Sequence, residues 1–256
     1  MQAGQGKTGH GKTGQQPDPL SARRSVASRL LAYLRQKATR HGPYHEVVSL
    51  GRACQPAHQL RRVLGISRAH VFDWIVTTDT GVRSLIADDL QGHFALDRLF
   101  RDDRGFVLER VTDTVFQHEF TQDDDIAAVH AITAPRVTAM VERWRKMMAS
   151  NASVLFIRQH AWSGSPADSA DALLSTLHAA GPRLRLRLLY LTEPHMTPVL
   201  PDKDDLLHRA MPLHPEGDWR GVSQIWEERL SEALSLDPPA KQAKRVPRCI
   251  SAEPSP

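Results

Sequence analysis

Short apolar segments alternate with amphipathic helical segments through the middle of this chain, and this alternation is what most constrains its fold. The run Val154–Ile157 is continuously apolar, which is typical of a strand covered on both faces. Alternating strands and helices favour a parallel sheet, because each connecting helix packs back onto the sheet. We therefore predict an α/β fold of three layers, with a largely parallel central sheet flanked by helices.

The individual elements are predicted from hydrophobic periodicity and from the turn residues that bound each segment. The predicted strands are Glu46–Leu50, Phe106–Val111, Thr114–Phe116, Val154–Ile157 and Leu184–Leu191. The predicted helices are a segment that begins near Pro56, Pro135–Ala149, Pro166–Ala180 and Ser223–Leu234. The first strand therefore leads through a short turn directly into the first of these helices.

The two ends of the chain differ in composition from its middle. Residues 1–20 form a low-complexity tail that repeats Gly, Lys and Thr, and residues 237–256 form a basic, Pro-rich tail; we expect both to be disordered. For residues 21–43 we predict an amphipathic basic helix that packs on the edge of the domain. The alternative is a helix that binds a membrane surface or a partner protein. Residues 44–236 are the predicted α/β domain.

Charge and cysteine content exclude several classes of protein. The net charge of +4 is small for 256 residues, and few aromatic side chains interleave with the basic ones, so a nucleic-acid groove is not indicated. No apolar run reaches the roughly 18 residues of a membrane span. Because one of the two cysteines lies centrally and the other in the tail, we expect no disulfide and a cytoplasmic, reducing location. An organelle transit peptide at residues 1–40 is the alternative.

Two patterns that suggest a bound group lack the structural context they need. Residues 6–13 match the phosphate-binding pattern G-x-x-x-x-G-K-[ST], but no strand precedes them and Pro17 and Pro19 follow where a helix is required. His41 and His45 have the spacing of a metal-binding pair, but the Gly-Pro sequence between them prevents the helix that would align their rings. We therefore expect no cofactor and no metal ion.

Cys54 has the most reactive setting of any side chain in the sequence. It follows the strand Glu46–Leu50 by a Gly-containing turn and stands where the next helix begins. Unpaired N–H groups and the helix dipole favour an anion there, so this position is expected to lower the pKa of the thiol. Arg61 and Arg62 in the same helix add positive potential. A small buried cysteine without a chemical role is the alternative.

Four sequence segments resemble those of a known bacterial family, the putative papain-like cysteine peptidases. Residues 48–62, VSLGRACQPAHQLRR, resemble its S-L-G-x-x-C signature followed by a Leu- and Arg-rich helix. Residues 72–74, FDW, are similar to its second block, although Val71 stands where the family has Pro. Residues 115–120, VFQHEF, resemble its H-D-F block with Glu119 in place of Asp, and residues 154–158 resemble its V-L-F-V-R strand. The resemblance spans about residues 45–230.

The resemblance implies that Cys54 is a nucleophile and that His118 is its base. In such a pair the imidazole takes the proton of the thiol. His118 lies between Phe116 and Phe120, so its ring is expected to point inward with theirs. From the residues alone, two other histidines remain open as the base: His160, which follows a buried strand at the sheet edge where active sites form, and a histidine one helical turn beyond Cys54, at position 58.

Asp73 and Glu119 are the candidates for the group that orients the imidazole, and a structural hydrogen-bond anchor is the alternative role for Asp73. Backbone N–H groups at Cys54 and in the adjacent turn are expected to form an oxyanion hole. The implied activity is hydrolysis of a peptide or small-molecule substrate through an acyl-enzyme. The alternatives are an acyltransferase or esterase, and a non-catalytic module that binds a sugar or nucleotide-sugar in cell-surface polysaccharide metabolism.

Overall fold

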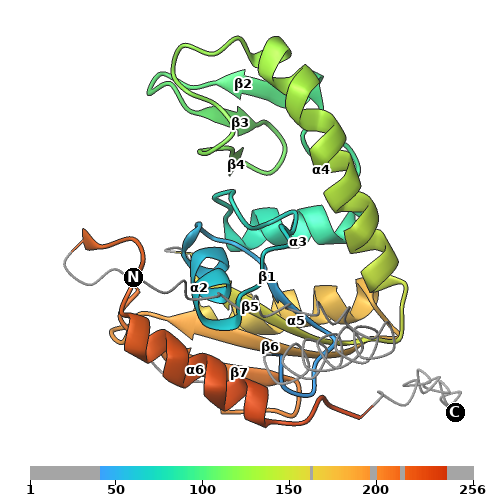
Figure 1. Cartoon of the computed structure of the whole chain (residues 1–256), viewed down its shortest axis with the longest axis vertical. Coiled ribbons are helices and arrows are strands. Elements are labelled where there is room, and N and C mark those ends of the chain that lie inside the picture. Colours follow the sequence, from blue (N-terminus) through green and yellow to red (C-terminus); the bar gives the residue numbers. More distant parts are fainter. Residues whose placement is uncertain (1–40, 162–163, 197–200, 214–216, 241–256) are drawn as a thin grey trace, which may run out of the picture. The chain divides into compact units, whose positions relative to one another are not determined.

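Four strands rich in Val and Leu pair in parallel, in the order β1-β5-β6-β7, in the computed structural model (Figure 1). Their bounds are β1 (Glu46–Ser49), β5 (Ser153–Gln159), β6 (Arg185–Thr192) and β7 (Leu206–Ala210). The structure describes residues 41–161, 164–196, 201–213 and 217–240. The predicted N-terminal tail, the predicted helix up to residue 40 and residues 241–256 of the predicted C-terminal tail lie outside these ranges.

Helices cover both faces of this sheet. On one face, α2 (Gln55–Leu64) and α6 (Ser223–Ser235) contribute to an apolar cluster with the strands, and its buried members include Leu60, Leu155 and Trp226. On the other face lie α3 (Asp79–Ala87), α4 (Ile126–Met148) and α5 (Pro166–Ala180), whose side chains share a cluster with Phe156 and Leu188. The predicted three-layer α/β fold with a parallel sheet is therefore confirmed.

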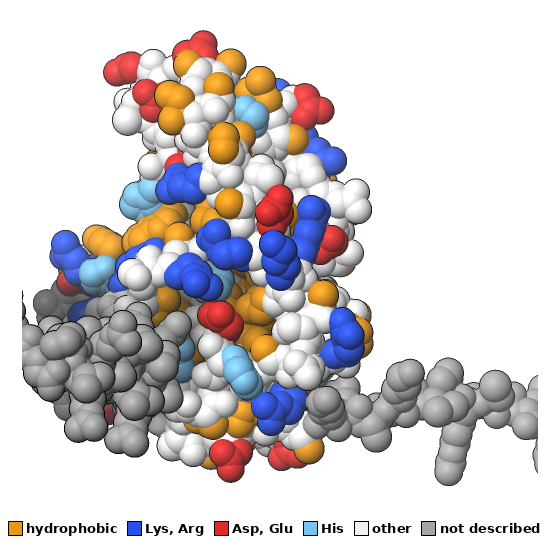
Figure 2. Space-filling model, turned by 45° about the vertical axis from the view of Figure 1, so that its right-hand side comes forward, with side chains coloured by type: hydrophobic (Ala, Val, Ile, Leu, Met, Phe, Trp, Pro, Cys, Tyr) orange, Lys and Arg blue, Asp and Glu red, His pale blue; other side chains and the backbone are white. Residues whose placement is uncertain are grey.

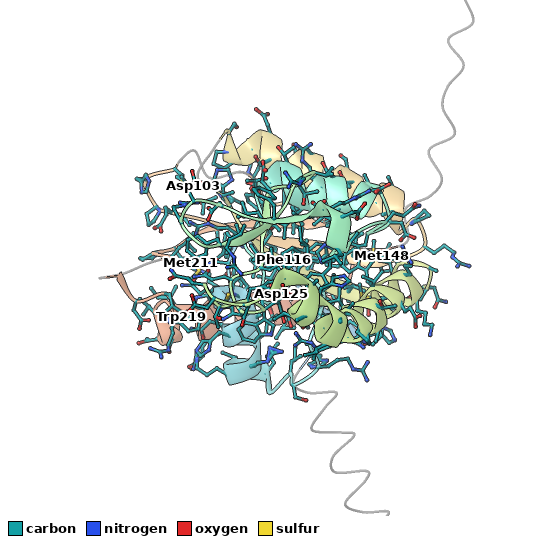
Figure 3. The ribbon with its side chains drawn as sticks, turned by 90° about the horizontal axis from the view of Figure 1, so that it is seen from above. Asp103, Phe116, Asp125, Met148, Met211 and Trp219 are labelled. Atoms are coloured by element: carbon teal, nitrogen blue, oxygen red, sulfur yellow. The ribbon has the colours of Figure 1, made fainter. Side chains whose placement is uncertain are left out.

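A second, antiparallel sheet lies between α3 and α4 in the chain. Its strands are β2 (Leu99–Arg101), β3 (Val107–Glu109) and β4 (Thr114–Val115), and the short 3-10 helix η1 (Leu96–Arg98) leads into β2. The two strands predicted here are present but shorter than predicted, and β2 was not predicted. Phe116, directly after β4, is buried and lies near the middle of the view in Figure 3. Val115 and Val76 exchange two backbone hydrogen bonds of 2.9 and 3.0 Å, which hold β4 against the segment before α3.

Helix α4 begins earlier than the sequence predicts. The predicted helix starts at Pro135, whereas α4 starts at Ile126 and contains Pro135 in its interior. The side chain of Asp125 accepts a hydrogen bond of 2.8 Å from the backbone N–H of Ala128 and caps the helix start. The prediction was wrong because proline is most favoured in the first turn of a helix, and here it occurs further along.

Two further elements of the domain, α3 and β7, were also not predicted. The side chain of Thr78 caps α3 by accepting a hydrogen bond of 2.9 Å from the N–H of Gly81.

The face drawn in Figure 2 carries Lys and Arg side chains with Asp and Glu among them. In the described ranges, no helix combines the length and the apolar character needed to cross a bilayer.

Candidate active site

A tight turn carries the chain from β1 to α2. Gly51 and Arg52 both have positive φ angles, 74° and 80°. A Cβ on Gly51 would lie 2.9 Å from the carbonyl oxygen of Phe72, so the turn requires glycine there. Arg52 adopts a backbone conformation that side-chain-bearing residues rarely tolerate, and its carbonyl accepts a hydrogen bond of 3.2 Å from the N–H of Thr77. This strained and tethered turn fixes the place of Cys54.

Cys54 and His118 meet although they lie 64 positions apart in the chain. Cys54 is the N-cap residue of α2, and its Sγ lies 2.8 Å from Nε2 of His118. His118 comes from the turn that follows β4 and is an exposed residue. The expectation that its ring points inward with Phe116 and Phe120 was therefore wrong, because strand alternation no longer applies once the chain has entered that turn.

The ring of Trp74 packs against the imidazole of His118. The two ring centroids are 5.6 Å apart with an interplanar angle of 76°, an edge-to-face contact. The guanidinium of Arg61, from α2, lies over the Trp74 ring at 4.7 Å, where the cation and the ring face attract each other. Trp74 is therefore the side chain in ring contact with His118, a position that the sequence analysis did not assign to it. The signal was its position beside Asp73 in the FDW block.

Neither carboxylate predicted to orient the imidazole is hydrogen-bonded to it within the described residues. Asp73 is buried, and its Oδ2 accepts a hydrogen bond of 2.9 Å from the N–H of His70 and lies 3.5 Å from Nη2 of Arg61. Glu119 forms an ion pair with Arg136. The contacts of Asp73 are those of a structural anchor for the segment that carries Trp74.

Burial opposes ionisation of the Cys54 thiol. It raises the pKa to about 11, and the carboxylate of Asp73 adds to that increase, while the backbone N–H of Cys54 lowers the pKa. The expected lowering by the helix start is therefore outweighed, because a helix dipole contributes only about 0.3–1 kcal/mol at such a position. Burial also raises the pKa of Asp73 to about 6. A thiolate at Cys54 consequently needs a proton acceptor beside it, and His118 occupies that place.

The two alternative histidines have other neighbours. His58, on α2, packs edge-on against the ring of Trp219 with centroids 5.0 Å apart. His160 is buried directly after β5, where its Nδ1 lies 3.0 Å from Oδ2 of Asp79. In the described part of the chain, no three His, Cys, Asp or Glu side chains are grouped as ligands for a metal ion.

Comparison with protein-family models gives a match over residues 45–190, to the family described as "Putative papain-like cysteine peptidase". The matched range includes both members of the Cys54–His118 pair. Comparisons with curated proteins and with solved structures gave no match. Because the match covers more than half of the chain, the protein belongs to the putative papain-like cysteine peptidase family.

Proposed function

We propose that the protein is a cysteine hydrolase, in which Cys54 attacks the carbonyl carbon of a peptide or small-molecule substrate. The observation that carries this proposal is the distance of 2.8 Å between Sγ of Cys54 and Nε2 of His118. A nucleophilic thiol within hydrogen-bond reach of an imidazole, with that imidazole oriented by a further group, is the arrangement that covalent catalysis requires. Trp74 supplies the orientation here through its edge-to-face contact.

Because burial raises the pKa of Cys54, the pair works by general-base catalysis from a neutral thiol. As Sγ bonds to the carbonyl carbon, Nε2 of His118 takes the proton of the thiol. The imidazolium then gives this proton to the leaving group, and a thioester remains on Cys54. Water attacks the thioester, the C–S bond breaks, and the carboxylic acid and the thiol are released.

Backbone N–H groups at the start of α2 are the proposed oxyanion hole. The first N–H groups of a helix have no carbonyl partner within it, so they remain available to the negatively charged oxygen of the tetrahedral intermediate. Cys54 and Gln55 supply such groups, whereas Pro56 in the first turn has none.

A free thiol in this role also needs a reducing compartment, and we propose the cytoplasm.

The test is the release of p-nitrophenol from p-nitrophenyl acetate, a general acyl donor. Cys54→Ser and His118→Gln are each expected to slow the release by about 100-fold or more, the usual contribution of a nucleophile or of its base. His58→Gln is the matched control, because it removes an imidazole from α2 without touching the pair, and its rate should equal that of the unmodified protein. Equal rates in the Cys54→Ser variant and the unmodified protein would refute the proposal.

A further inference from the structure

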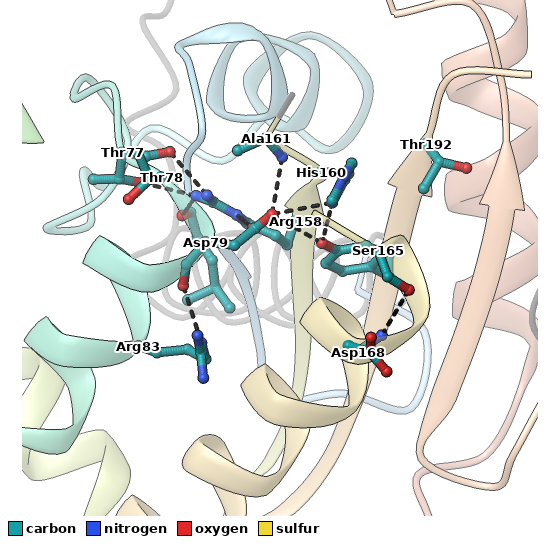
Figure 4. A network of polar contacts seen from close by, with 12 residues as sticks. Thr77, Thr78, Asp79, Arg83, Arg158, His160, Ala161, Ser165, Asp168 and Thr192 are labelled. Carbon is teal, nitrogen blue, oxygen red and sulfur yellow. Dashed lines mark hydrogen bonds and ion pairs between the residues drawn. The ribbon is translucent and has the colours of Figure 1, made fainter. Parts of the chain in front are cut away.

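Polar side chains gather at the carboxyl ends of β5 and β6, beside α3 and α5 (Figure 4). Arg158 lies in β5 and His160 follows it, Tyr190 lies in β6, and Asp79 begins α3. All four residues are buried, with at most 5% of their surface exposed. Burying such groups costs free energy unless each polar atom is hydrogen-bonded, so the partner of each atom matters.

Arg158 holds this cluster together. Its Nε donates to Oδ1 of Asp79 at 3.0 Å, its Nη1 donates to Thr77 Oγ1 at 2.8 Å and to the carbonyl of Leu50 at 2.9 Å, and its Nη2 donates to the carbonyl of Thr77 at 2.8 Å. Burial alone would raise the pKa of Asp79, but hydrogen bonding to His160 and the charge of Arg158 lower it below its ordinary value. Asp79 is therefore a carboxylate.

The carboxylate of Asp79 fixes the tautomer of His160. Nδ1 of His160 lies 3.0 Å from Oδ2 of Asp79 and 2.7 Å from the hydroxyl of Tyr190, which itself donates to the same carboxylate oxygen at 3.2 Å. A carboxylate can only accept, so Nδ1 carries the proton, and in the neutral imidazole the lone pair is then on Nε2. Nε2 is buried, and no hydrogen-bonding partner for it exists among the described residues.

A purely structural role does not account for this free nitrogen. Arg158 and Asp79 suffice to tie α3 to the sheet, and an unsatisfied buried acceptor costs about 1–3 kcal/mol. Cys54, for its part, already has the imidazole of His118. Nε2 of His160 is therefore unsatisfied in this structure, and a ligand that brought a hydrogen-bond donor to it would satisfy it.

His160, which carries this Nε2 atom, lies at the same edge of the sheet as Cys54. β1 and β5 are adjacent and parallel, with Ser49 opposite Ile157, so the segments that carry Cys54 and His160 leave neighbouring strands at their carboxyl ends. The bond from Arg158 to the carbonyl of Leu50 ties the cluster to the turn that delivers Cys54.

We propose that Asp79 and His160 form a second acid–base pair, which binds the O–H group of the acyl acceptor, water or an alcohol, and takes its proton. This rests on the function proposed above. In the step, the acceptor oxygen bonds to the carbonyl carbon of the Cys54 thioester, its proton passes to Nε2 of His160, and the C–S bond breaks to leave the Cys54 thiolate. The proton then returns through solvent to the sulfur. His118 serves acylation, and His160 serves deacylation.

Pre-steady-state kinetics with p-nitrophenyl acetate separate the two steps, because acylation gives a burst of p-nitrophenol and deacylation sets the subsequent steady rate. His160→Gln should leave the burst rate within about twofold and slow the steady rate by about 100-fold, the scale of general-base catalysis. With glycerol added, the unmodified protein should form the glyceryl ester and His160→Gln should not, which distinguishes an alcohol from water as acceptor. His178→Gln is the matched control, since His178 also pairs with a carboxylate, Asp205 at 2.8 Å, before the start of β7.

A folded His160→Gln variant with an unchanged steady rate would overturn this inference and leave the proposed function intact. Absence of a burst in the unmodified protein, or its persistence in Cys54→Ser, would instead defeat the proposed function. Should His160→Gln fail to fold, long-range ¹H–¹⁵N NMR of the unmodified protein still decides. The proton of His160 should be on Nδ1 at about pH 7, and a proton on Nε2 would overturn the inference.

Discussion

Replacing His118 by Gln should expose how strongly burial suppresses the Cys54 thiolate. Without the imidazole, the thiol keeps the pKa of about 11 that burial and the Asp73 carboxylate impose. At about pH 7.5 such a thiol is ionised in roughly 3 of 10,000 molecules, whereas a free thiol with a pKa of about 8.5 is ionised in roughly one of ten. The folded variant should therefore be alkylated at Cys54 at least about 300-fold more slowly than the same variant unfolded in urea.

Iodoacetamide labelling followed by peptide mass spectrometry measures this rate at Cys54 separately from Cys249. Repeating the labelling over a range of pH should show the rate at Cys54 rising towards about pH 11. If the folded variant is labelled at neutral pH as fast as the unfolded one, then the start of the helix, and not the imidazole, generates the thiolate, and the mechanism proposed above is refuted.

Three further sets of substitutions test contacts described above. In the His118→Gln variant, the further change Asp73→Asn should lower the pH at which Cys54 is labelled, because the carboxylate raises the pKa of that thiol. Because the pKa of Asp73 is raised to about 6 in the folded protein, the free energy of unfolding measured in urea should decrease as the pH rises from about 4 to 6, and Asp73→Asn should abolish this decrease. Arg158→Met should lower the free energy of unfolding by about 3–5 kcal/mol, because Asp79 is left buried without its cation, and Arg158→Met combined with Asp79→Leu should recover part of this loss; an unchanged urea midpoint would contradict it. Asp125→Ala should cost about 1 kcal/mol in the same assay through loss of the α4 cap, and no cost would show the cap to be dispensable.

The sequence was sufficient to predict three of the four strands of the parallel sheet and the position of Cys54. Glu46–Leu50 and Val154–Ile157 are local, apolar and bounded by turn signals, so β1 and β5 could be recognised from neighbouring residues alone. The turn at Gly51 and the helix start that follows it are local features as well. His118 could be paired with Cys54 only through the family resemblance, because nothing local links residues 64 positions apart.

What could not be predicted depends on tertiary contacts. The sequence position of Cys54 indicates a helix start, but not the burial that reverses the expected direction of its pKa shift. Asp79 and His160 lie 81 positions apart, because the small sheet, α4 and β5 lie between them in the chain. No local pattern in the sequence therefore indicated that they pair. One signal was present: Arg158 directly follows the apolar run Val154–Ile157, and a charge in a buried strand requires a buried partner.

The central claim is that Cys54, assisted by His118, becomes acylated. The most direct measurement is mass spectrometry of the protein after brief reaction with p-nitrophenyl acetate and rapid acid quenching. We expect one acetyl group on the peptide that contains Cys54, formed slowly in His118→Gln and absent in Cys54→Ser. Acetylation at other residues only, or equally fast acetylation of Cys54 without the imidazole, would contradict the account.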